Sequence, residues 1–454
     1  MAVSLANDER ARGPWIAKRS QCTLVMLVGL ANFSTGTYLA WPAIASPIFD
    51  QNGYPTNNQG TSWVRASVAL GAIIGSLPAG TIAGRISRKR SILISSLLLS
   101  SCWFVIGFAR GKLWLFLARF VAGLSCGVSS ILIPLYLSEI MVDCVKISLR
   151  TMLQLATALG VLFTYSVEFT NSLTTIVLLC ALAPGFLSIA TQSIPESPVW
   201  LIRQNRQTAA QEILTHYGGR RLSEQEISRE SVPISELWKH RKATIIALGM
   251  MMFQQLSGMN TLISYATTIF RYIRFPLSPT SCSIIVGLTY VIATLSSESL
   301  IDRTKRKLLL FLSLSIMSVS MFVLSGYFRL QKTEDVSNFT WLPFLSFIIY
   351  VAAFGVGCGP IPWILIEKIF PEDVKTTAIS ASIVCEWLSA FVAMKLFQDM
   401  LSSMGISSTF AAYGMVSLIG TAFVAILVPE TEGRSIEEIQ IELHKEHDTS
   451  GYCI

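Results

Sequence analysis

Charged residues are scarce in this sequence of 454 residues: Asp, Glu, Lys and Arg make up 14%, whereas 52% of the residues are hydrophobic. Soluble domains carry about 25% charged residues, because a folded chain needs polar side chains to cover its surface. A soluble protein of this length would form two or three domains, and the polar residues here are too few to cover them. The composition therefore excludes a soluble globular protein and indicates a polytopic membrane protein.

Histidines and paired cysteines are also scarce. The four histidines form no ligand constellation, and the nine cysteines are scattered without the paired spacing of a disulfide framework or a metal site. We interpret the cysteines as small, polarizable packing residues. No nucleophile–base arrangement is visible either, so we expect no enzyme activity, no metal and no cofactor.

The strand alternation of membrane barrels is absent, so the spanning segments are expected to be helices. A spanning helix needs about 20 largely apolar residues. Twelve segments meet this requirement, at residues 20–42, 63–84, 92–110, 113–136, 151–170, 173–192, 243–268, 281–301, 308–328, 342–366, 376–398 and 408–428. We therefore predict an all-α membrane protein with twelve transmembrane helices.

The net charge of +7 is not distributed as in a nucleic-acid-binding protein. With both termini placed in the cytoplasm, the inside segments hold 26 of the 35 Lys and Arg residues and the outside loops hold six. This is the positive-inside bias of a protein with an even number of spans. The segment after residue 19 lacks a small-residue cleavage site and is too long for a signal peptide, so we predict a retained span. The expected partner is the lipid bilayer, not nucleic acid.

The longest polar interruption divides the predicted spans into six plus six. The predicted organisation is a cytoplasmic tail at 1–19, a six-helix bundle at 20–194, a cytoplasmic linker with short helices at 195–242, a second six-helix bundle at 243–428 and a cytoplasmic tail at 429–454. The second and eighth spans both end in Arg-x-x-Arg-Lys, which starts at Arg85 and at Arg303. Repeated halves with a site at their interface are typical of secondary transporters.

Five short motifs follow one another along the chain: Arg119-Phe-x-x-Gly123, Pro195-Glu-Ser-Pro198, Gln254-Gln-Leu-Ser-Gly-x-Asn260, Gly359-Pro-Ile-Pro-Trp363 and Pro429-Glu-Thr-x-Gly433. Through them the chain resembles the sugar porter family of the major facilitator superfamily over residues 20–435. Within that family it is similar to the insect facilitated trehalose transporters and the facilitative glucose transporters. The resemblance implies two six-helix bundles, a plasma-membrane location, a sugar substrate carried by alternating access, and function as a monomer.

Three amide side chains, Gln254, Gln255 and Asn260, surround a Ser-Gly pair in the seventh predicted span. An amide offers both a donor and an acceptor without net charge, which matches the hydroxyl groups of a sugar. The Ser-Gly pair permits a helix break, which is tolerated only beside a cavity or protein. Hydrogen bonds between helices, without a ligand, are the alternative interpretation. The resemblance implies a substrate site at these residues and their pocket neighbours, namely Gln154, Gln254, Gln255, Asn260, Tyr290, Trp363, Glu386 and Trp387.

Glycines and prolines concentrate in the tenth predicted span, where they permit either a static kink or a bending gate. The resemblance favours a gate formed by Gly359, Pro360 and Pro362, with Tyr265 in an outer gate. It also implies a latch of ion pairs between the halves at the cytoplasmic surface; for a single basic residue there, positive-inside anchoring is an equal alternative. The predicted latch residues are Arg85, Arg88, Glu139, Lys146, Glu196, Asp302, Arg303, Arg306, Glu367 and Lys375.

The pocket departs from the family pattern, because Tyr290 stands where an Asn or Gln is usual, Glu386 where an Asn is usual, and Ser264 where an aromatic residue is usual. Similar proton-coupled transporters carry an aspartate in the first span, whereas residues 20–49 contain no acidic side chain. We therefore predict facilitated diffusion of trehalose or a hexose. A proton–sugar symporter that uses Glu386 and a transport-inactive sugar sensor are the alternatives. Asn338 begins an N-glycosylation sequon in a predicted outside loop and is a candidate for modification.

Overall fold

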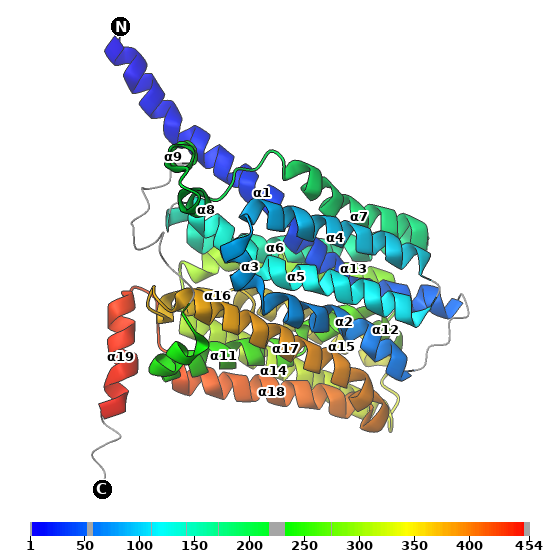
Figure 1. Ribbon diagram of the computed structural model, residues 1–454. Helices are drawn as coiled ribbons and strands as arrows, with labels where there is room; N and C mark the ends of the chain where they lie inside the picture. The colour runs from blue at the N-terminus through cyan, green and yellow to red at the C-terminus, as the bar shows by residue number, and fades with distance from the viewer. Residues whose placement is uncertain are drawn as a thin grey trace.

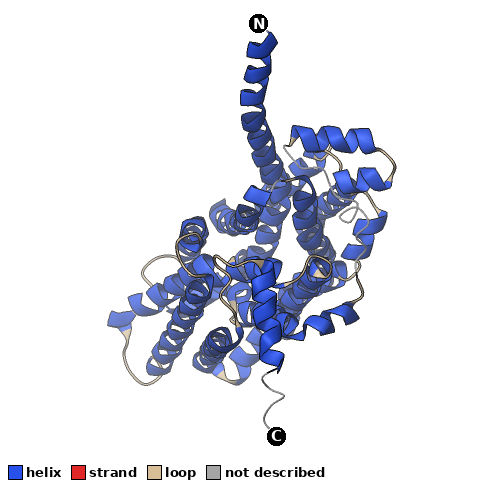
Figure 2. Cartoon of the chain, turned by 90° about the vertical axis from the view of Figure 1, so that its left-hand side faces the viewer, coloured by secondary structure: helices blue, strands red, loops and turns tan. Residues whose placement is uncertain are grey.

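The computed structural model describes residues 2–51, 58–109, 111–141, 143–170, 172–217, 232–273 and 275–448. Only the backbone is described at 2–19, 46–51, 58–59, 143–150 and 444–448, and at Thr81, Ala83, Gly84 and Ser337. Within these limits every regular element is a helix, as Figure 2 shows. The predicted all-α class is confirmed.

The helices before the linker form the first half of the chain. They are α1 (Ala2–Gln51), α2 (Asn58–Ser76), α3 (Ala79–Arg85), α4 (Arg88–Phe108), α5 (Lys112–Ile140), α6 (Asp143–Val167) with η1 (Glu168–Thr170), and α7 (Leu173–Ala190). In the predicted linker lie α8 (Pro198–Arg203), α9 (Gln207–His216) and η2 (Ile234–His240).

The second half begins directly after η2. Its helices are α11 (Arg241–Leu256), α12 (Met259–Ile273), α13 (Pro279–Ile301), α14 (Arg306–Leu330), η3 (Ser337–Phe339), α15 (Trp341–Ala353), the π-helical turn η4 (Phe354–Cys358), α16 (Ile361–Ile369), α17 (Lys375–Ser403), α18 (Gly405–Leu427) and α19 (Ile436–Asp448).

Among the described residues, ten helical segments are long and apolar enough to cross a membrane. The two remaining predicted spans are interrupted helices. Residues 63–84 are divided between α2 and α3 by Leu77 and Pro78, and residues 243–268 between α11 and α12 by Ser257 and Gly258. Hydropathy predicted these two segments because it averages over a window, but neither contains one long apolar helix.

The two halves pack side by side, with α4, α5 and α7 in the upper part of Figure 1 and α14, α17 and α18 in the lower part. Three helix pairs make most of the contacts between the halves: α2 with α17, α6 with α13, and α1 with α12. The start of α1 lies at the left end of Figure 1, together with α8, α9 and α19, and we call this end the termini face; the other end is the far face. Figure 2 views the molecule from the termini face.

Large apolar side chains cover much of the outer surface of the helices. Phe108 is 83% exposed and Ile426 is 78% exposed, and similar residues lie on helices of both halves. So many exposed large apolar side chains are unfavourable in water and favourable against lipid tails. The helical architecture and its surface are therefore those of a multi-pass membrane protein.

Candidate functional site

A central cavity of about 140 Å³ lies between the two halves. About 10–15 Å³ suffices for one water molecule, so the cavity is much larger than a water site. Its polar lining comes from both halves, with Asn32, Thr35, Ser130, Gln154 and Thr157 from the first and Gln254, Gln255, Asn260, Tyr290, Trp363, Glu386 and Trp387 from the second. Among the residues that the structure describes, the lining contains no lysine, arginine or histidine.

The break in the seventh span places three amides at this cavity. Gly258 has a backbone φ of +101°, a conformation that costs glycine little and strains other residues. Its carbonyl accepts the first hydrogen bond of α12, from Leu262 N at 2.8 Å. Gln254 and Gln255 end α11, while Asn260 begins α12, so the break gathers side chains that a straight helix would distribute around its circumference.

The amides form an ordered hydrogen-bond network with an acid. Asn260 Nδ2 donates to Gln255 Oε1 at 2.7 Å, and Gln255 Nε2 donates to Glu386 Oε1 at 3.1 Å. Tyr290 of α13 and Gln154 of α6 come from different halves, and both side chains line the cavity. The cavity lining is therefore shared between the two halves.

Three buried polar atoms of the lining lack a hydrogen-bond partner: Gln154 Nε2, Gln254 Oε1 and Trp387 Nε1. Gln254 and Trp387 are 3% and 6% exposed. A buried polar atom without a partner costs roughly 1–3 kcal/mol, so such atoms need an explanation. Two donors and one acceptor around a cavity free of basic residues suit an uncharged ligand that both accepts and donates hydrogen bonds.

All eight predicted substrate residues line this one cavity, although their contact with a substrate stays a prediction. Sequence reasoning did not place Asn32, Thr35 or Thr157 in the pocket, although all three line it. The sequence spacing could have indicated each of them, because residues three positions apart in the sequence lie on one face of a helix. Asn32 and Thr35 have this spacing, and Thr157 lies three residues after Gln154.

The tenth span changes its helical form beside the cavity. Residues 354–358 form a π-helical turn in which Gly359 N donates to Phe354 O at 2.8 Å, and α16 begins after Pro360. A Cβ atom at residue 359 would lie 1.9 Å from Gln154 Nε2, so the absence of a side chain here lets the Gln154 amide of the first half lie against the tenth span. The predicted gate residues thus coincide with a local change in helix geometry, and their movement stays a prediction.

Comparison with known proteins identifies the family. The chain matches the family described as sugar (and other) transporter over residues 22–443.

The chain belongs to this family.

The facilitated trehalose transporter Tret1 of Culex quinquefasciatus is 31% identical over 441 residues, which cover 93% of this chain and 85% of that protein. Tret1 of Aedes aegypti is 31% identical over 433 residues, which cover 91% of this chain but only 53% of that longer protein. Among solved structures, a partially occluded inward-open conformation of the xylose transporter XylE from E. coli gives a TM-score of 0.77 at 23% identity, covering 91% of this chain and 99% of that chain. The predicted family and fold are confirmed, and the protein is a transporter and not an enzyme.

The far face of the transporter is closed by contacts between the halves. The Tyr165 hydroxyl donates to Ile263 O at 2.7 Å, and the Ser264 hydroxyl donates to Leu39 O at 2.8 Å. Arg65 of α2 completes the closure, because its Nη1 donates to Ser264 O at 3.0 Å. At residue 264 the side-chain hydroxyl thus donates, and the backbone carbonyl accepts, across the interface between the halves.

Tyr265, the predicted outer-gate residue, lies in this closed region and is 1% exposed. The Arg65 guanidinium lies 3.7 Å from the centroid of the Tyr265 ring, which is a cation–π contact between the halves. Such a contact contributes about 0.5–2 kcal/mol, and more when it is shielded from water. Tyr265 is placed where an outer gate requires it, and its role in gating stays a prediction.

Replacing Tyr165 with phenylalanine tests this closure, because it deletes the hydroxyl and keeps the ring. One lost hydrogen bond is worth about 1 kcal/mol, so we expect the population with an open far face to rise about fivefold. Spin labels at the exposed residues Leu113 and Leu277 would report the separation of the halves there. Tyr272→Phe, at an exposed tyrosine of α12, is the control. An unchanged distance distribution in Tyr165→Phe would contradict a closing role for this bond.

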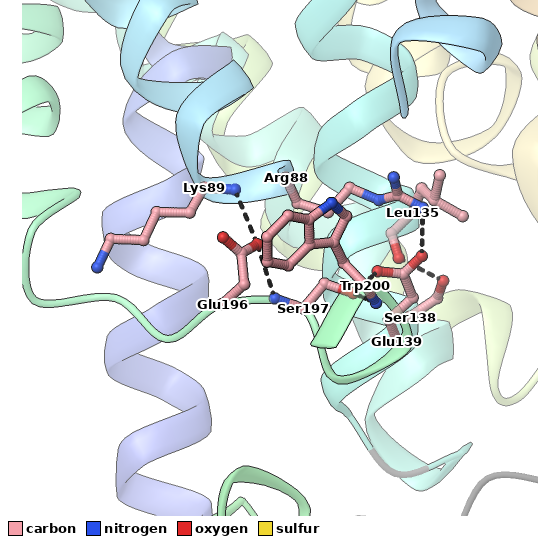
Figure 3. A network of polar contacts seen from close by, with 8 residues as sticks. All are labelled: Arg88, Lys89, Leu135, Ser138, Glu139, Glu196, Ser197 and Trp200. Atoms are coloured by element: carbon pink, nitrogen blue, oxygen red, sulfur yellow. Dashed lines mark hydrogen bonds and ion pairs between the residues drawn. The ribbon is translucent and has the colours of Figure 1, made fainter. Parts of the chain in front are cut away.

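On the termini face, the first half contains a buried cluster of charges, drawn in Figure 3. Arg88 Nη2 contacts Glu139 Oε1 at 2.9 Å, with both side chains less than 10% exposed. Glu196 accepts from Lys89 N at 3.3 Å at the start of α4. Ser197 donates to Glu139 through its hydroxyl and caps α8 by accepting from Trp200 N at 3.2 Å. The cluster ties α4, α5 and the start of the linker together.

The second half repeats this arrangement with partners that sequence reasoning missed. Arg306 Nη2 contacts Glu432 Oε2 at 2.8 Å, and Glu430 accepts from Lys307 N at 3.3 Å. Glu430 therefore repeats the contact of Glu196, since each carboxylate binds an N–H group at a helix N-terminus. The signal was present in the sequence, because Pro-Glu-Ser and Pro-Glu-Thr follow the sixth and twelfth spans.

The structure places the other predicted latch residues separately. Arg85, Asp302 and Arg303 are exposed, and Glu367 is half-buried. Lys375 pairs with Glu372 at 2.9 Å within the second half. The side chain of Lys146 lies outside the described part. The ion pairs Arg88–Glu139 and Arg306–Glu432 each lie within one half, so these two do not join the halves in this conformation.

Two further predictions concern sites other than the cavity. No group of three or more His, Cys, Asp or Glu residues suited to a metal ion occurs among the described residues. Asn338 is exposed and lies in η3 on the far face, between α14 and α15. An exposed position is required for N-glycosylation, and the modification itself stays a prediction.

Proposed function

We propose that this transporter carries trehalose or a hexose across the plasma membrane by facilitated diffusion. The observation that carries the proposal is the set of unpartnered atoms, Gln154 Nε2, Gln254 Oε1 and Trp387 Nε1, in a cavity between the two halves. A sugar hydroxyl both donates and accepts, so one sugar ring satisfies all three atoms without supplying charge. Trp363 and Trp387 add aromatic faces that suit the C–H face of a sugar.

The positive-inside bias supports a cytoplasmic location for the termini face. The bonds between the halves on the far face would then close the extracellular side, and the cavity would open toward the cytoplasm. Transport would require the halves to rock about the cavity, which breaks the contacts of Tyr165, Ser264 and Arg65 and closes the termini face. Net flux would follow the sugar gradient, because no covalent step or energy source enters the cycle.

The cavity lining of α1 supports a facilitated mode. Asn32 and Thr35 are its polar side chains, and both are uncharged. Glu386 supports proton–sugar symport as a second candidate, because an ionisable residue inside a membrane protein is the usual proton site and this one belongs to the amide network. The two modes differ in whether a proton accompanies each sugar.

Uptake of labelled trehalose and glucose into oocytes, with and without a protonophore, tests the proposal. We expect uptake that the protonophore does not change. Loss of uptake on adding the protonophore would support symport through Glu386 and contradict the facilitated mode. Absence of uptake of either sugar despite expression at the cell surface would contradict both transport modes and support a sugar sensor.

Replacing Gln154 with methionine keeps the size of the side chain and removes its hydrogen bonds. We expect the half-saturation concentration for the transported sugar to rise about tenfold, because one hydrogen bond to a buried polar atom is lost. Initial rates of uptake over a range of sugar concentrations measure the change. Gln211→Met, at an exposed position of α9, is the matched control. Equal half-saturation concentrations in the two variants would exclude Gln154 from the site.

A further inference from the structure

The break in the tenth span leaves a backbone carbonyl without its usual hydrogen-bond donor, and a side chain of another helix donates to it. In an α-helix each carbonyl accepts from the N–H group four residues later, and proline has none. Pro362 follows Cys358 by four residues, so the Cys358 carbonyl lacks its usual donor. Gln254 Nε2 of α11 donates to Cys358 O at 2.8 Å and to the neighbouring Gly359 O at 2.9 Å. Both N–H groups of the Gln254 amide are therefore engaged by the broken helix.

In the first half, too, a proline leaves a backbone carbonyl without its usual donor, and a side chain of another helix donates to that carbonyl. Pro42 follows Tyr38 by four residues, and Arg119 Nη1 of α5 donates to Tyr38 O at 3.1 Å. The other guanidinium nitrogens of Arg119 also donate to backbone carbonyls, and this residue does not line the cavity. All three guanidinium nitrogens of Arg119 thus donate to the protein backbone, and one of them donates to the carbonyl that Pro42 leaves without its usual donor.

Gln254 differs because the other atom of its amide is left for a ligand. Gln254 Oε1 is buried and unpartnered, and the residue lines the cavity. The hydrogen bonds of Nε2 fix the orientation of the planar amide, so they also fix where Oε1 lies. An amide in this position can accept a hydrogen bond from a ligand and cannot donate one.

We propose that Gln254 is a positioning residue that couples sugar occupancy to the bend in the tenth span. Its N–H groups replace the donor missing at Pro362, and its oxygen accepts from a sugar hydroxyl. A change in the bend moves the two carbonyls and reorients the amide, which alters the affinity for the sugar. By linkage, the sugar alters the equilibrium of the bend to the same extent. The inference rests on the proposed function for the identity of the ligand.

A double-mutant cycle of Gln254→Met and Pro362→Ala tests the coupling. Gln254→Met removes the donor to Cys358 O and the acceptor, so we expect turnover to fall about tenfold and the half-saturation concentration to rise about tenfold. Pro362→Ala restores an N–H group that competes with Gln254 for Cys358 O. In the wild-type background we expect Pro362→Ala to lower turnover about fivefold. In the Gln254→Met background it supplies the missing donor, and we expect it to raise turnover about threefold without lowering the half-saturation concentration.

The sign of the Pro362→Ala effect on turnover is the decisive readout. A merely structural role for either residue predicts losses that add, and the same loss from Pro362→Ala in both backgrounds would overturn the proposal. Spin labels at the exposed residues Gln211 and Asp373 report the separation of the halves on the termini face without sugar. We expect Gln254→Met to shift this distance distribution and Pro362→Ala to reverse the shift.

The label distances separate failure of this inference from failure of the proposed function. If the wild-type protein carries no sugar but the distances change as expected, the proposed function fails and the coupling between Gln254 and the bend stands. If sugar is carried but the distances do not respond to either substitution, the coupling fails and the proposed function stands.

Discussion

Replacing Gly123 with alanine is expected to prevent most of the transporter from folding. A Cβ atom at this position would lie 2.2 Å from Val68 O and 3.0 Å from Gly71 Cα, and both of these are backbone atoms of α2. The contact is reciprocal, since a Cβ atom at Gly71 would lie 2.1 Å from Phe120 O of α5. No side-chain rotation relieves such an overlap, so α2 and α5 would have to separate.

The overlap recurs one helical turn further along the same interface. A Cβ atom at Gly75 would lie 2.1 Å from Leu124 O, and one at Gly127 would lie 2.1 Å from Ala72 O. Two Gly-x-x-x-Gly pairs therefore face each other, the arrangement by which membrane helices approach closely and pack without a hydrophobic driving force. Separating the helices removes that packing along the whole contact, and we expect destabilisation of about 3 kcal/mol or more.

Gly326→Ala is the matched control, because Gly326 is also a glycine inside a long helix and its added Cβ atom would meet nothing within 4 Å. Detergent-solubilised protein, measured by size-exclusion chromatography and by its melting temperature, reports the folded fraction. We expect Gly123→Ala to lose most of its monodisperse peak and Gly326→Ala to keep it. A normal peak and melting temperature for Gly123→Ala would show that α2 and α5 tolerate a wider separation.

Helix positions could be predicted from the sequence because a backbone in lipid has to satisfy its hydrogen bonds within each segment. Ten of the predicted spans correspond to helical segments that are long and apolar enough to cross a membrane, among the described residues. The interruptions at Leu77–Pro78 and Ser257–Gly258 follow from local chemistry that hydropathy does not measure. Proline lacks a donor, and Gly258 adopts a positive φ, and both effects act over fewer residues than a hydropathy window.

The residues that line the candidate site could be predicted from the sequence, but the direction of their hydrogen bonds could not. Amide side chains in an apolar span indicate a polar cavity, and the eight predicted residues do line one. Whether Gln254 offers a sugar its nitrogen or its oxygen depends on Cys358 and Gly359, which are more than 100 residues away in sequence. The repeated Pro-Glu pair points to Glu430, whereas the pairing of Arg306 with Glu432 is visible only in the folded chain, which brings these two residues together.

Replacing Arg119 with methionine is expected to destabilise the first half as strongly as any single substitution in the chain. The guanidinium is 0% exposed and donates to three backbone carbonyls, Val64 O at 2.9 Å, Tyr38 O at 3.1 Å and Arg65 O at 3.3 Å. It also lies 5.1 Å from the centroid of the Trp41 ring. These contacts join α5 to α1 and α2, and one of them satisfies the carbonyl that Pro42 leaves without a donor.

Arg119→Lys separates the effect of charge from that of geometry. Hydrogen bonds from a charged donor contribute about 1.5–3 kcal/mol each, and relief from burying a charge offsets part of their loss in the methionine variant. Lysine keeps the charge but places its donors on one atom, so it cannot replace the planar fork that reaches three separate carbonyls. We expect melting temperatures in the order wild type, Arg119→Lys, Arg119→Met, with Arg329→Met, at an exposed position of α14, close to wild type.

The order of these melting temperatures decides what keeps an arginine inside the membrane. If the melting temperature of Arg119→Lys equals that of wild type, a positive charge near Trp41 is sufficient for stability, and the hydrogen bonds to the three carbonyls add little to it. If the melting temperature of Arg119→Met equals that of wild type, the Tyr38 carbonyl tolerates the loss of its donor. Side-chain donors to carbonyls that a proline leaves without an N–H partner are then dispensable in this fold. The expected order instead makes the fork geometry of Arg119 a structural requirement, because burying an ion inside the membrane is costly unless its donors are satisfied.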